Sequence, residues 1–433
     1  MMKKGRRNLV PIVLSITLLV MMFAAMSFQA IAQDGATATP TPSDDSGNEG
    51  NTESRDYYAD PASSTGDAEW TIEERSFTSN YPNGFQFSAR VSSSKGDIEN
   101  ATVMWSHAPR NQGRRAATYD ESTGLFTSVY DNSEGTPPWV AVNYRWILTD
   151  TAGNTYRSEW FMGEEYYDDP SQWERFESED IIVFVEEGLP EDTGQQTLDA
   201  MAAQRETYRQ AWGDVLSYRP RAILFSNRAS FDEWRVGQGN PNVIGQTNAA
   251  WGGIVQVVSG GGVIDLAWGT VLHEVGHLYQ DEFVPAGLPV ATWQNEGNAT
   301  LFELYQMYDY EQRVRDLAAS GQLPALLIGS GPSQNSQGPD GRNRLGYDMG
   351  YVFYKWFVEV YGLDAHRQLI EALGPSLGFN AALEQVTGLT TQEIERRWRT
   401  WLGASPDAPT PIPIPTMRFP PTVTPFIFPT ASN

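Results

Sequence analysis

Large apolar residues alternate with smaller or more polar ones along residues 140–148, which is the period of a half-buried β-strand. A turn cluster follows at residues 150–154, and residues 155–161 resume as a partner strand. About 100 residues in this style predict an all-β sandwich over residues 67–167. We find no motif in this region that indicates chemistry.

The pattern changes at residue 168, where strand-like and helix-like stretches follow one another. Apolar residues recur at helical spacing over residues 198–215, and the chain after residue 262 is patterned as helices throughout. Residues 168–403 therefore predict a second, mixed α+β domain. Short apolar runs predict its buried strands: residues 181–185, 222–225 and 253–258.

Two segments lack any such periodicity. Residues 33–66 are rich in Thr, Pro, Ser, Gly and acidic side chains, and residues 404–433 are rich in Pro and Thr. Neither can bury enough apolar surface to offset the cost of ordering, so we expect a disordered spacer and a disordered tail. We expect both to hold the folded part away from a cell envelope with which they associate, and the alternative is an ordinary solvated tail.

The first 32 residues predict export. Four basic residues precede an apolar run over residues 9–28, and Ala30-Ile31-Ala32 gives a small-x-small cleavage site, as in a secretory signal peptide. The alternative is an uncleaved membrane anchor, because the run is close to spanning length. We expect a secreted or extracytoplasmic protein at the cell surface, with no membrane insertion once the signal is cleaved.

The composition of the chain excludes several kinds of partner and functional site. The 30 Lys and Arg face 54 Asp and Glu, a net charge of −24, which argues against nucleic acid or an anionic lipid surface as the partner. Cysteine is absent, so disulfides, thiolate metal sites and cysteine nucleophiles are excluded. A metal site must therefore use carboxylates and the four histidines: His107, His273, His277 and His366. We expect His107 and His366 to be structural.

The strongest motif is His-Glu-Val-Gly-His at residues 273–277. Histidines four residues apart lie about 40° apart around a helix, so the rings of His273 and His277 project from one face and can bind one Zn²⁺. Glu274 lies beside them, placed to take a proton from a zinc-bound water. We expect Asp265 to cap this helix. Its buried face would comprise Leu272, Val275 and Tyr279.

A third ligand would separate a metal site from accidental spacing. Glu296 lies 19 residues beyond His277, after a connection broken by prolines and a glycine. A helix, a turn and a second helix of this length can return its carboxylate to the histidines. The alternative is a solvated carboxylate on a helix surface. Thr300, one turn further, either supports a ligand or simply packs.

At these motifs the chain resembles the gluzincin metallopeptidases, and within them the peptidase MA-like group. These proteins share a His-Glu-x-x-His helix and a downstream Glu ligand in an Asn-Glu-Gly context. The resemblance runs from about residue 171 to 402 and is densest over residues 271–305. It implies Zn²⁺ as the cofactor, held in a His-Glu-x-x-His-x18-Glu pattern, and these metal ligands: His273, His277 and Glu296.

The resemblance also implies two catalytic residues. Glu274 corresponds to the catalytic base and acid of the group. Residues 347–350, Tyr-Asp-Met-Gly, are similar to a Tyr-x-x-Gly motif whose tyrosine donates to the oxyanion in related aminopeptidases. By that correspondence Tyr347 is the second candidate. The alternative for Tyr347 is a core position, because it begins a stripe of tyrosines at helical spacing.

The predicted fold class is α+β. We expect a zincin-like metallopeptidase domain, with a small sheet, an active-site helix and a C-terminal helical part. The all-β sandwich before it resembles immunoglobulin or fibronectin type III modules.

One departure from the group concerns the substrate. The Gly-x-Met-Glu-Asn exopeptidase motif of the aminopeptidase members is missing, so the resemblance does not imply an anchor for a free amine. Instead residues 248–251, Asn-Ala-Ala-Trp, precede the strand at 253–258, similar to the substrate-edge strand of thermolysin-like endopeptidases. A peptide backbone could pair with such an edge.

Together these features predict an exported zinc metallopeptidase that hydrolyses a peptide or protein substrate. Two neutral imidazoles and one carboxylate leave the fourth zinc position for a water whose proton Glu274 takes and later gives to the leaving amine. One alternative is a cell-surface binding or adhesion protein on a catalytically silent zincin scaffold. Another is a hydrolase of a different class that uses the same zinc water.

Overall fold

The computed structural model describes residues 57–109, 112–133, 135–235, 243–258, 261–285, 287–288, 290–329, 331–333, 336–374 and 377–408. The predicted signal peptide, the spacer up to residue 56 and the tail from residue 409 lie outside these ranges. Within them, no helix combines the length and apolar character needed to cross a membrane.

The N-terminal part consists of two antiparallel sheets. One has the order β1-β9-β8-β4-β5, with β10 also paired to β8, and the other has the order β2-β3-β7-β6. The all-β character predicted for residues 67–167 is therefore confirmed, while the immunoglobulin or fibronectin resemblance stays a prediction. The strands are β1 (Ser63–Thr65), β2 (Trp70–Ser79), β3 (Gly84–Ser93), β4 (Ile98–Ser106), β5 (Gly113–Ala116), β6 (Thr118–Asp120), β7 (Leu125–Asp131), β8 (Val140–Asp150), β9 (Thr155–Arg157) and β10 (Phe161–Tyr166).

The predicted spacer over residues 33–66 was wrong at its C-terminal end. Ser63–Thr65 forms β1 and pairs antiparallel with β9, so this segment is an edge strand. The hydroxyl groups of Thr65 and Thr155 lie 2.7 Å apart and hydrogen-bond across the pair. Small hydroxylated residues suit a strand as well as a linker when a partner strand supplies the backbone hydrogen bonds, and composition alone does not show that partner.

A third sheet follows, with the order β11-β12-β13-β15-β14. The strands β12, β13 and β15 run parallel to one another, and β11 and β14 pair antiparallel at the two edges. We had expected residues 253–258 to form the edge, but β15 is an inner strand and the four-residue β14 is the edge. The strands are β11 (Trp173–Glu177), β12 (Ile182–Glu186), β13 (Arg221–Phe225), β14 (Gly245–Asn248) and β15 (Gly253–Val257).

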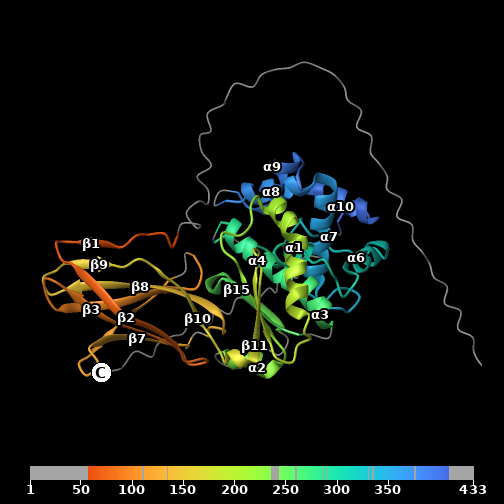
Figure 1. Ribbon diagram of the computed structural model, residues 1–433. Coiled ribbons are helices and arrows are strands. Elements are labelled where there is room, and N and C mark those ends of the chain that lie inside the picture. The colour runs from red at the N-terminus through yellow and green to blue at the C-terminus, as the bar shows by residue number, and fades with distance from the viewer. Residues whose placement is uncertain are drawn as a thin grey trace, which may run out of the picture. The chain divides into compact units, whose positions relative to one another are not determined.

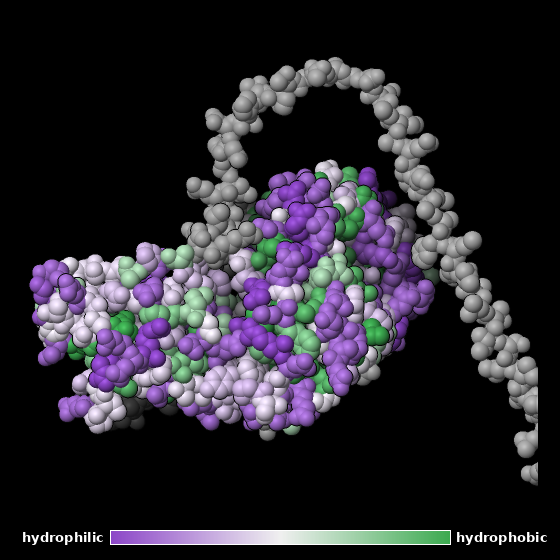
Figure 2. All heavy atoms as spheres, in the orientation of Figure 1, coloured by the Kyte–Doolittle hydropathy of each residue, from purple (hydrophilic) through white to green (hydrophobic). Residues whose placement is uncertain are grey.

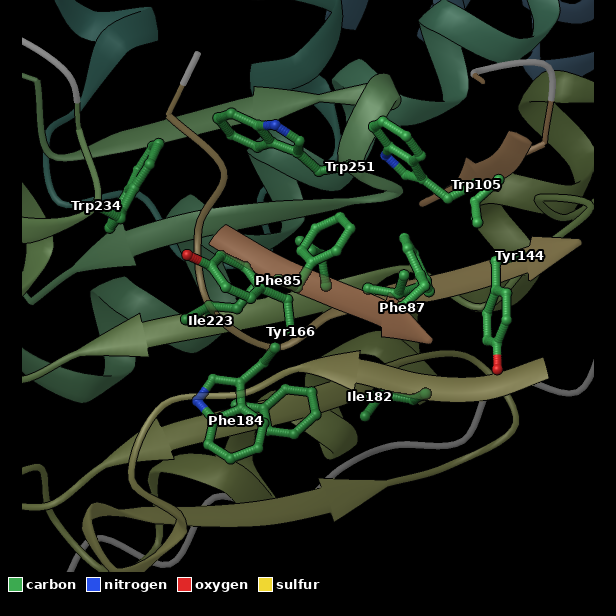
Figure 3. Close-up of a cluster of buried hydrophobic side chains, with 14 of the residues drawn as sticks. Phe85, Phe87, Trp105, Tyr144, Tyr166, Ile182, Phe184, Ile223, Trp234 and Trp251 are labelled. Carbon is green, nitrogen blue, oxygen red and sulfur yellow. The ribbon is translucent and has the colours of Figure 1, made fainter. Parts of the chain in front are cut away.

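The inner strands of this sheet are buried on both faces, which explains their continuous apolar runs. On β12, Val183 and Val185 pack with helices α1 and α4, beside the sheet in Figure 1. Ile182 and Phe184 face the other way and join the core of the N-terminal sheets (Figure 3). There Trp139 stacks on Phe184 with ring centroids 4.9 Å apart. The predicted boundary at residues 167 and 168 thus separates sheets that share one core.

Helices make up the rest of the chain, and the α+β fold class predicted from the sequence is confirmed. Hydrophilic residues cover most of the face drawn in Figure 2, in keeping with the charge of −24. The helices are α1 (Thr193–Trp212), α2 (Arg228–Glu233), α3 (Gly262–Asp265), α4 (Val271–Phe283), α5 (Thr292–Leu301), α6 (Tyr310–Ala319), α7 (Leu345–Tyr361), α8 (Leu363–Ala372), α9 (Phe379–Thr387) and α10 (Thr391–Leu402), with the short turns η1 (Pro170–Gln172), η2 (Ala249–Trp251) and η3 (Leu266–Thr270).

The helix that carries the His-Glu-x-x-His motif begins earlier than predicted. Asp265 has helical dihedral angles and makes no capping hydrogen bond, because α3 and the π-helical turn η3 lead continuously into α4. The expected cap at Asp265 was therefore wrong. The predicted buried face of α4 is confirmed: Leu272, Val275 and Tyr279 are at most 4% exposed.

Candidate metal centre

Three helices meet closely at the site, and glycines permit their approach. A Cβ atom at Gly276 of α4 would lie 3.2 Å from the Ala299 Cα atom of α5. On the other side of α5, a Cβ at Gly297 would lie 2.3 Å from the backbone of Gly350 in α7. Any larger residue would push the helices apart. The glycines inside the three motifs therefore let α5 lie between α4 and α7.

This packing brings the three predicted ligands together. The Nε2 atom of His273 lies 3.3 Å from Glu296 Oε2, and the Nε2 atom of His277 lies 3.4 Å from the same oxygen. One ligand atom from each residue falls within 4.8 Å of the other two. All three side chains are nearly buried, with 10–15% of their surface exposed.

These distances fit a tetrahedral divalent ion. Bonds of about 2.0–2.1 Å to His nitrogen and carboxylate oxygen place neighbouring ligand atoms about 3.3–3.4 Å apart. The donor set of two imidazoles and one carboxylate is that of catalytic zinc sites, which keep a fourth position open. We therefore conclude that the residues present fit Zn²⁺, although their role as ligands stays a prediction.

A second carboxylate supports His273 from behind. Glu303 Oε1 lies 3.0 Å from the Nδ1 atom of His273, and its side chain is 7% exposed. Burial lowers the pKa of His273, but the hydrogen bonds to Glu296 and Glu303 outweigh it and raise the pKa to about 10. Two buried carboxylates thus stabilise a positive charge here, which a proton or a metal ion can supply. Metal-ligating histidines commonly carry such a carboxylate partner.

Thr300 also lies at His273, as the sequence suggested it could. Its hydroxyl is 3.4 Å from His273 Nδ1 and donates to the backbone oxygen of Glu296 at 2.8 Å. Since Glu303 is closer to the same nitrogen, Thr300 fixes the ligand helix more than it orients the ring.

Glu274 faces the edge strand β14. The hydroxyl of Thr247 hydrogen-bonds both the backbone oxygen of Glu274, at 3.0 Å, and its carboxylate. A Cβ at Gly245 would lie 2.9 Å from Glu274 Oε1, so glycine there leaves room for the carboxylate. Glu274 is not among the three ligand groups, and its Oε1 atom lies on the side of Gly245.

Tyr347 lies at the site and not only in the core. Its ring stacks on His273 with centroids 5.9 Å apart, and its side chain hydrogen-bonds Glu296. Burial, followed by the nearby Glu296 carboxylate, raises the pKa of Tyr347 well above its usual value. The phenol therefore keeps its proton at neutral pH and can donate it in a hydrogen bond.

The other two histidines lie elsewhere and behave as structural residues, as predicted. His107 Nδ1 lies 2.7 Å from the Ala141 carbonyl oxygen, and His366 bridges Ala211 and Asn298 in the interior.

Sequence reasoning missed Glu303 and Thr247. Glu303 lies seven residues after Glu296, which is nearly two helical turns, so this spacing could have indicated a shared face. Thr247 belongs to a strand of four polar or small residues, and no pattern in the sequence links it to Glu274.

Comparisons with known proteins agree with these motifs. Residues 247–404 match the family model of the Peptidase MA superfamily. The comparison with curated proteins found no match.

Among solved structures, three similar chains are metallopeptidases or a related hydrolase. An M1 zinc metallopeptidase from Deinococcus radiodurans has a TM-score of 0.34 and 14% identity over 80% of this chain and 65% of its own. Leukotriene A4 hydrolase from Saccharomyces cerevisiae has a TM-score of 0.31 and 10% identity over 82% of this chain and 61% of its own. The ZmpB metallopeptidase from Clostridium perfringens has a TM-score of 0.33 and 11% identity over 80% of this chain and 73% of its own. This chain thus spans less than two thirds of the length of the first two.

The matched segment contains every motif on which the resemblance was based, at residues 273–277, 295–297 and 347–350. Residues 247–404 thus match the Peptidase MA superfamily, in agreement with the gluzincin resemblance of the motifs.

Proposed function

We propose that this protein is an exported zinc-dependent metallopeptidase that hydrolyses peptide bonds, with Glu274 as general base and acid. The observation that carries the proposal is the convergence of His273, His277 and Glu296, whose ligand atoms lie within 4.8 Å of one another, beside Glu274, which is not among them.

His273, His277 and Glu296 would hold the zinc, which when bound polarises a carbonyl and lowers the pKa of a water to about 7. Glu274 lies one residue from the first ligand, so its carboxylate would take a proton from the attacking water and return it to the leaving amine. The Thr247 hydroxyl holds one of its oxygens and fixes the orientation of the carboxylate.

Tyr347 would stabilise the negative charge that develops on the scissile carbonyl oxygen. Its hydroxyl is protonated and buried beside the ligand set, and a hydrogen bond in such a site is stronger than in water. In the absence of substrate the hydroxyl bonds to Glu296, so donation to the substrate requires a small rotation of the side chain.

The substrate class follows from the edge strand. Among the described strands β14 pairs only with β15, and Glu274 lies against it. An extended peptide can add to such an edge by backbone hydrogen bonds, which bring its carbonyls past the site. We propose peptide or protein substrates outside the cytoplasm, and neither nucleic acid nor membrane as a partner.

Glu274→Gln tests the proposal. We expect wild-type protein loaded with zinc to cleave casein or a peptide library, and the variant to lose turnover by roughly 10²–10⁴-fold while keeping its zinc. Glu282→Gln, eight residues further along the same helix where the side chain accepts from the Ser217 backbone N–H, is the matched control and should keep activity. If zinc-loaded wild-type protein cleaves no peptide, the proposal fails in favour of a binding protein on this scaffold.

A further inference from the structure

Arg344 occupies a strained position at the start of α7, three residues before Tyr347. Its φ and ψ angles are 72° and 20°, in the left-handed region that side-chain-bearing residues seldom adopt. Among the described residues only Glu74 and Trp139 share a positive φ without being glycine. Strain of this kind persists where the surrounding structure or a function requires it.

The guanidinium of Arg344 lies over the aromatic residues of the site. Its central carbon is 4.3 Å from the ring centroid of Tyr347 and 5.6 Å from that of Tyr310. Its Nε atom is buried and has no hydrogen-bond partner. Within the described part of the chain, its guanidinium makes neither a hydrogen bond nor a close ion pair, and its charge lowers the pKa of Glu303 and Asp348 only from a greater distance.

The two carboxylates whose pKa Arg344 lowers make closer contacts with other side chains. Asp348 pairs with Arg313 in the interior, and Glu303 accepts from His273. Arg344 also lies at the N-terminal end of α7, where the helix dipole disfavours a positive charge. Backbone strain, an unpaired donor and an unfavourable dipole together make this a poor place for an arginine whose task is stability.

We propose that Arg344 binds a carboxylate of the peptide substrate, close to the scissile bond. This inference rests on the proposed function. Guanidinium presents two parallel N–H groups that match the two oxygens of a carboxylate, and burial strengthens such a pair. The other charged groups of the site are mainly acidic, and among the described residues no carboxylate lies within ion-pair distance of Arg344, so a substrate anion can pair with it directly.

The position limits where that carboxylate lies in the substrate. Arg344 stacks on the ring of Tyr347, whose hydroxyl reaches the ligand Glu296. An extended peptide advances about 3.3–3.6 Å per residue, so the carboxylate belongs one or two residues from the cleaved bond. The chemistry fits two sources: the C-terminal carboxylate of a short peptide, or the side chain of an Asp or Glu.

Binding to zinc-loaded Glu274→Gln protein tests this without turnover. Three peptides of one neutral sequence serve as probes: the free acid, the C-terminal amide, and an amide with one Glu substituted near the centre. We expect a carboxylate-bearing probe to bind at least about tenfold more tightly than the neutral amide. Preference for the free acid identifies a C-terminal carboxylate, and preference for the Glu peptide identifies a side chain.

Substitutions separate binding from structure. Arg344→Gly in the same protein relieves the backbone strain, so we expect the thermal midpoint to stay or rise while the carboxylate preference disappears. Arg342→Gln, which removes an exposed arginine paired with Asp340, should keep the preference. Equal binding of all three peptides to the protein with Arg344 intact overturns the inference.

The outcomes also distinguish this inference from the proposed function. If wild-type protein cleaves the free acid, the neutral amide and the Glu-substituted amide equally well, the peptidase stands and the role of Arg344 is wrong. If wild-type protein cleaves nothing while the carboxylate preference depends on Arg344, the binding site stands and the peptidase is wrong.

Discussion

Two buried histidines on different sides of α5 show what separates a metal centre from a packed interior. Glu296 and Asn298 are two residues apart on this helix, so their side chains point about 200° apart. Glu296 faces His273, which also contacts Glu303. Asn298 faces His366, whose other nitrogen lies 2.8 Å from the Ala211 carbonyl oxygen.

The partners give the two rings opposite charge preferences. Burial lowers the pKa of His366 to about 4, because only a backbone carbonyl opposes it. At His273 burial acts in the same direction, but the carboxylates raise the pKa to about 10. His273 is 8% exposed and His366 is 0% exposed, so depth hardly distinguishes them. What distinguishes a cation site is the carboxylates around the ring.

Glu296→Gln should have the largest effect on the difference between the two histidine sites. The amide keeps the shape of the side chain but removes the ligand charge, so we expect zinc affinity to fall by more than about 100-fold, beyond the usual effect of an outer partner. Competition with a chromogenic chelator measures it. Undiminished affinity in the variant would mean that Glu296 is not a ligand.

Glu303→Gln should have a smaller effect on the same measurement. Loss of a carboxylate that orients a ligating histidine typically weakens metal binding by about 10–100-fold. Asn298→Ser, on the His366 side of α5, is the control and should leave zinc affinity unchanged. Equal effects of the two substitutions would refute the assignment of Glu303 as the supporting carboxylate.

The smallest effect concerns the stability of the His366 side. The pKa of His366 is lower in the folded than in the unfolded state, where it is about 6.5. Its contribution to the free energy of unfolding is therefore complete above pH 6.5 and is lost as the pH falls toward 4. Between pH 7 and 5.5 the loss is about 1 kcal/mol. Urea unfolding of wild type and His366→Gln at both pH values checks it, and parallel pH profiles would contradict it.

Local geometry explains what the sequence predicted well. The four-residue spacing of His273 and His277 places both rings on one helix face wherever the helix lies, and the buried face of α4 follows from the same period. Helix periodicity alone does not predict the position of Glu296, because its carboxylate reaches the histidines only through the close helix contacts that Gly276 and Gly297 permit. The motif context supplied that step.

Contacts across the fold explain what could not be predicted. Thr247 reaches Glu274 from a four-residue edge strand whose composition resembles a loop. Ser63–Thr65 becomes a strand only because β9 is present beside it. The start of the ligand helix moved upstream of Asp265 because a π-helical turn continues it, and no residue pattern marks such a turn.

The metal content of purified mature protein tests the central claim most directly, measured by atomic emission for wild type beside His277→Ala and His366→Ala. We predict about one zinc per chain in wild type and in His366→Ala, and almost none in His277→Ala. Zinc that survives in His277→Ala, or that is absent from folded wild-type protein supplied with the metal, would contradict the account.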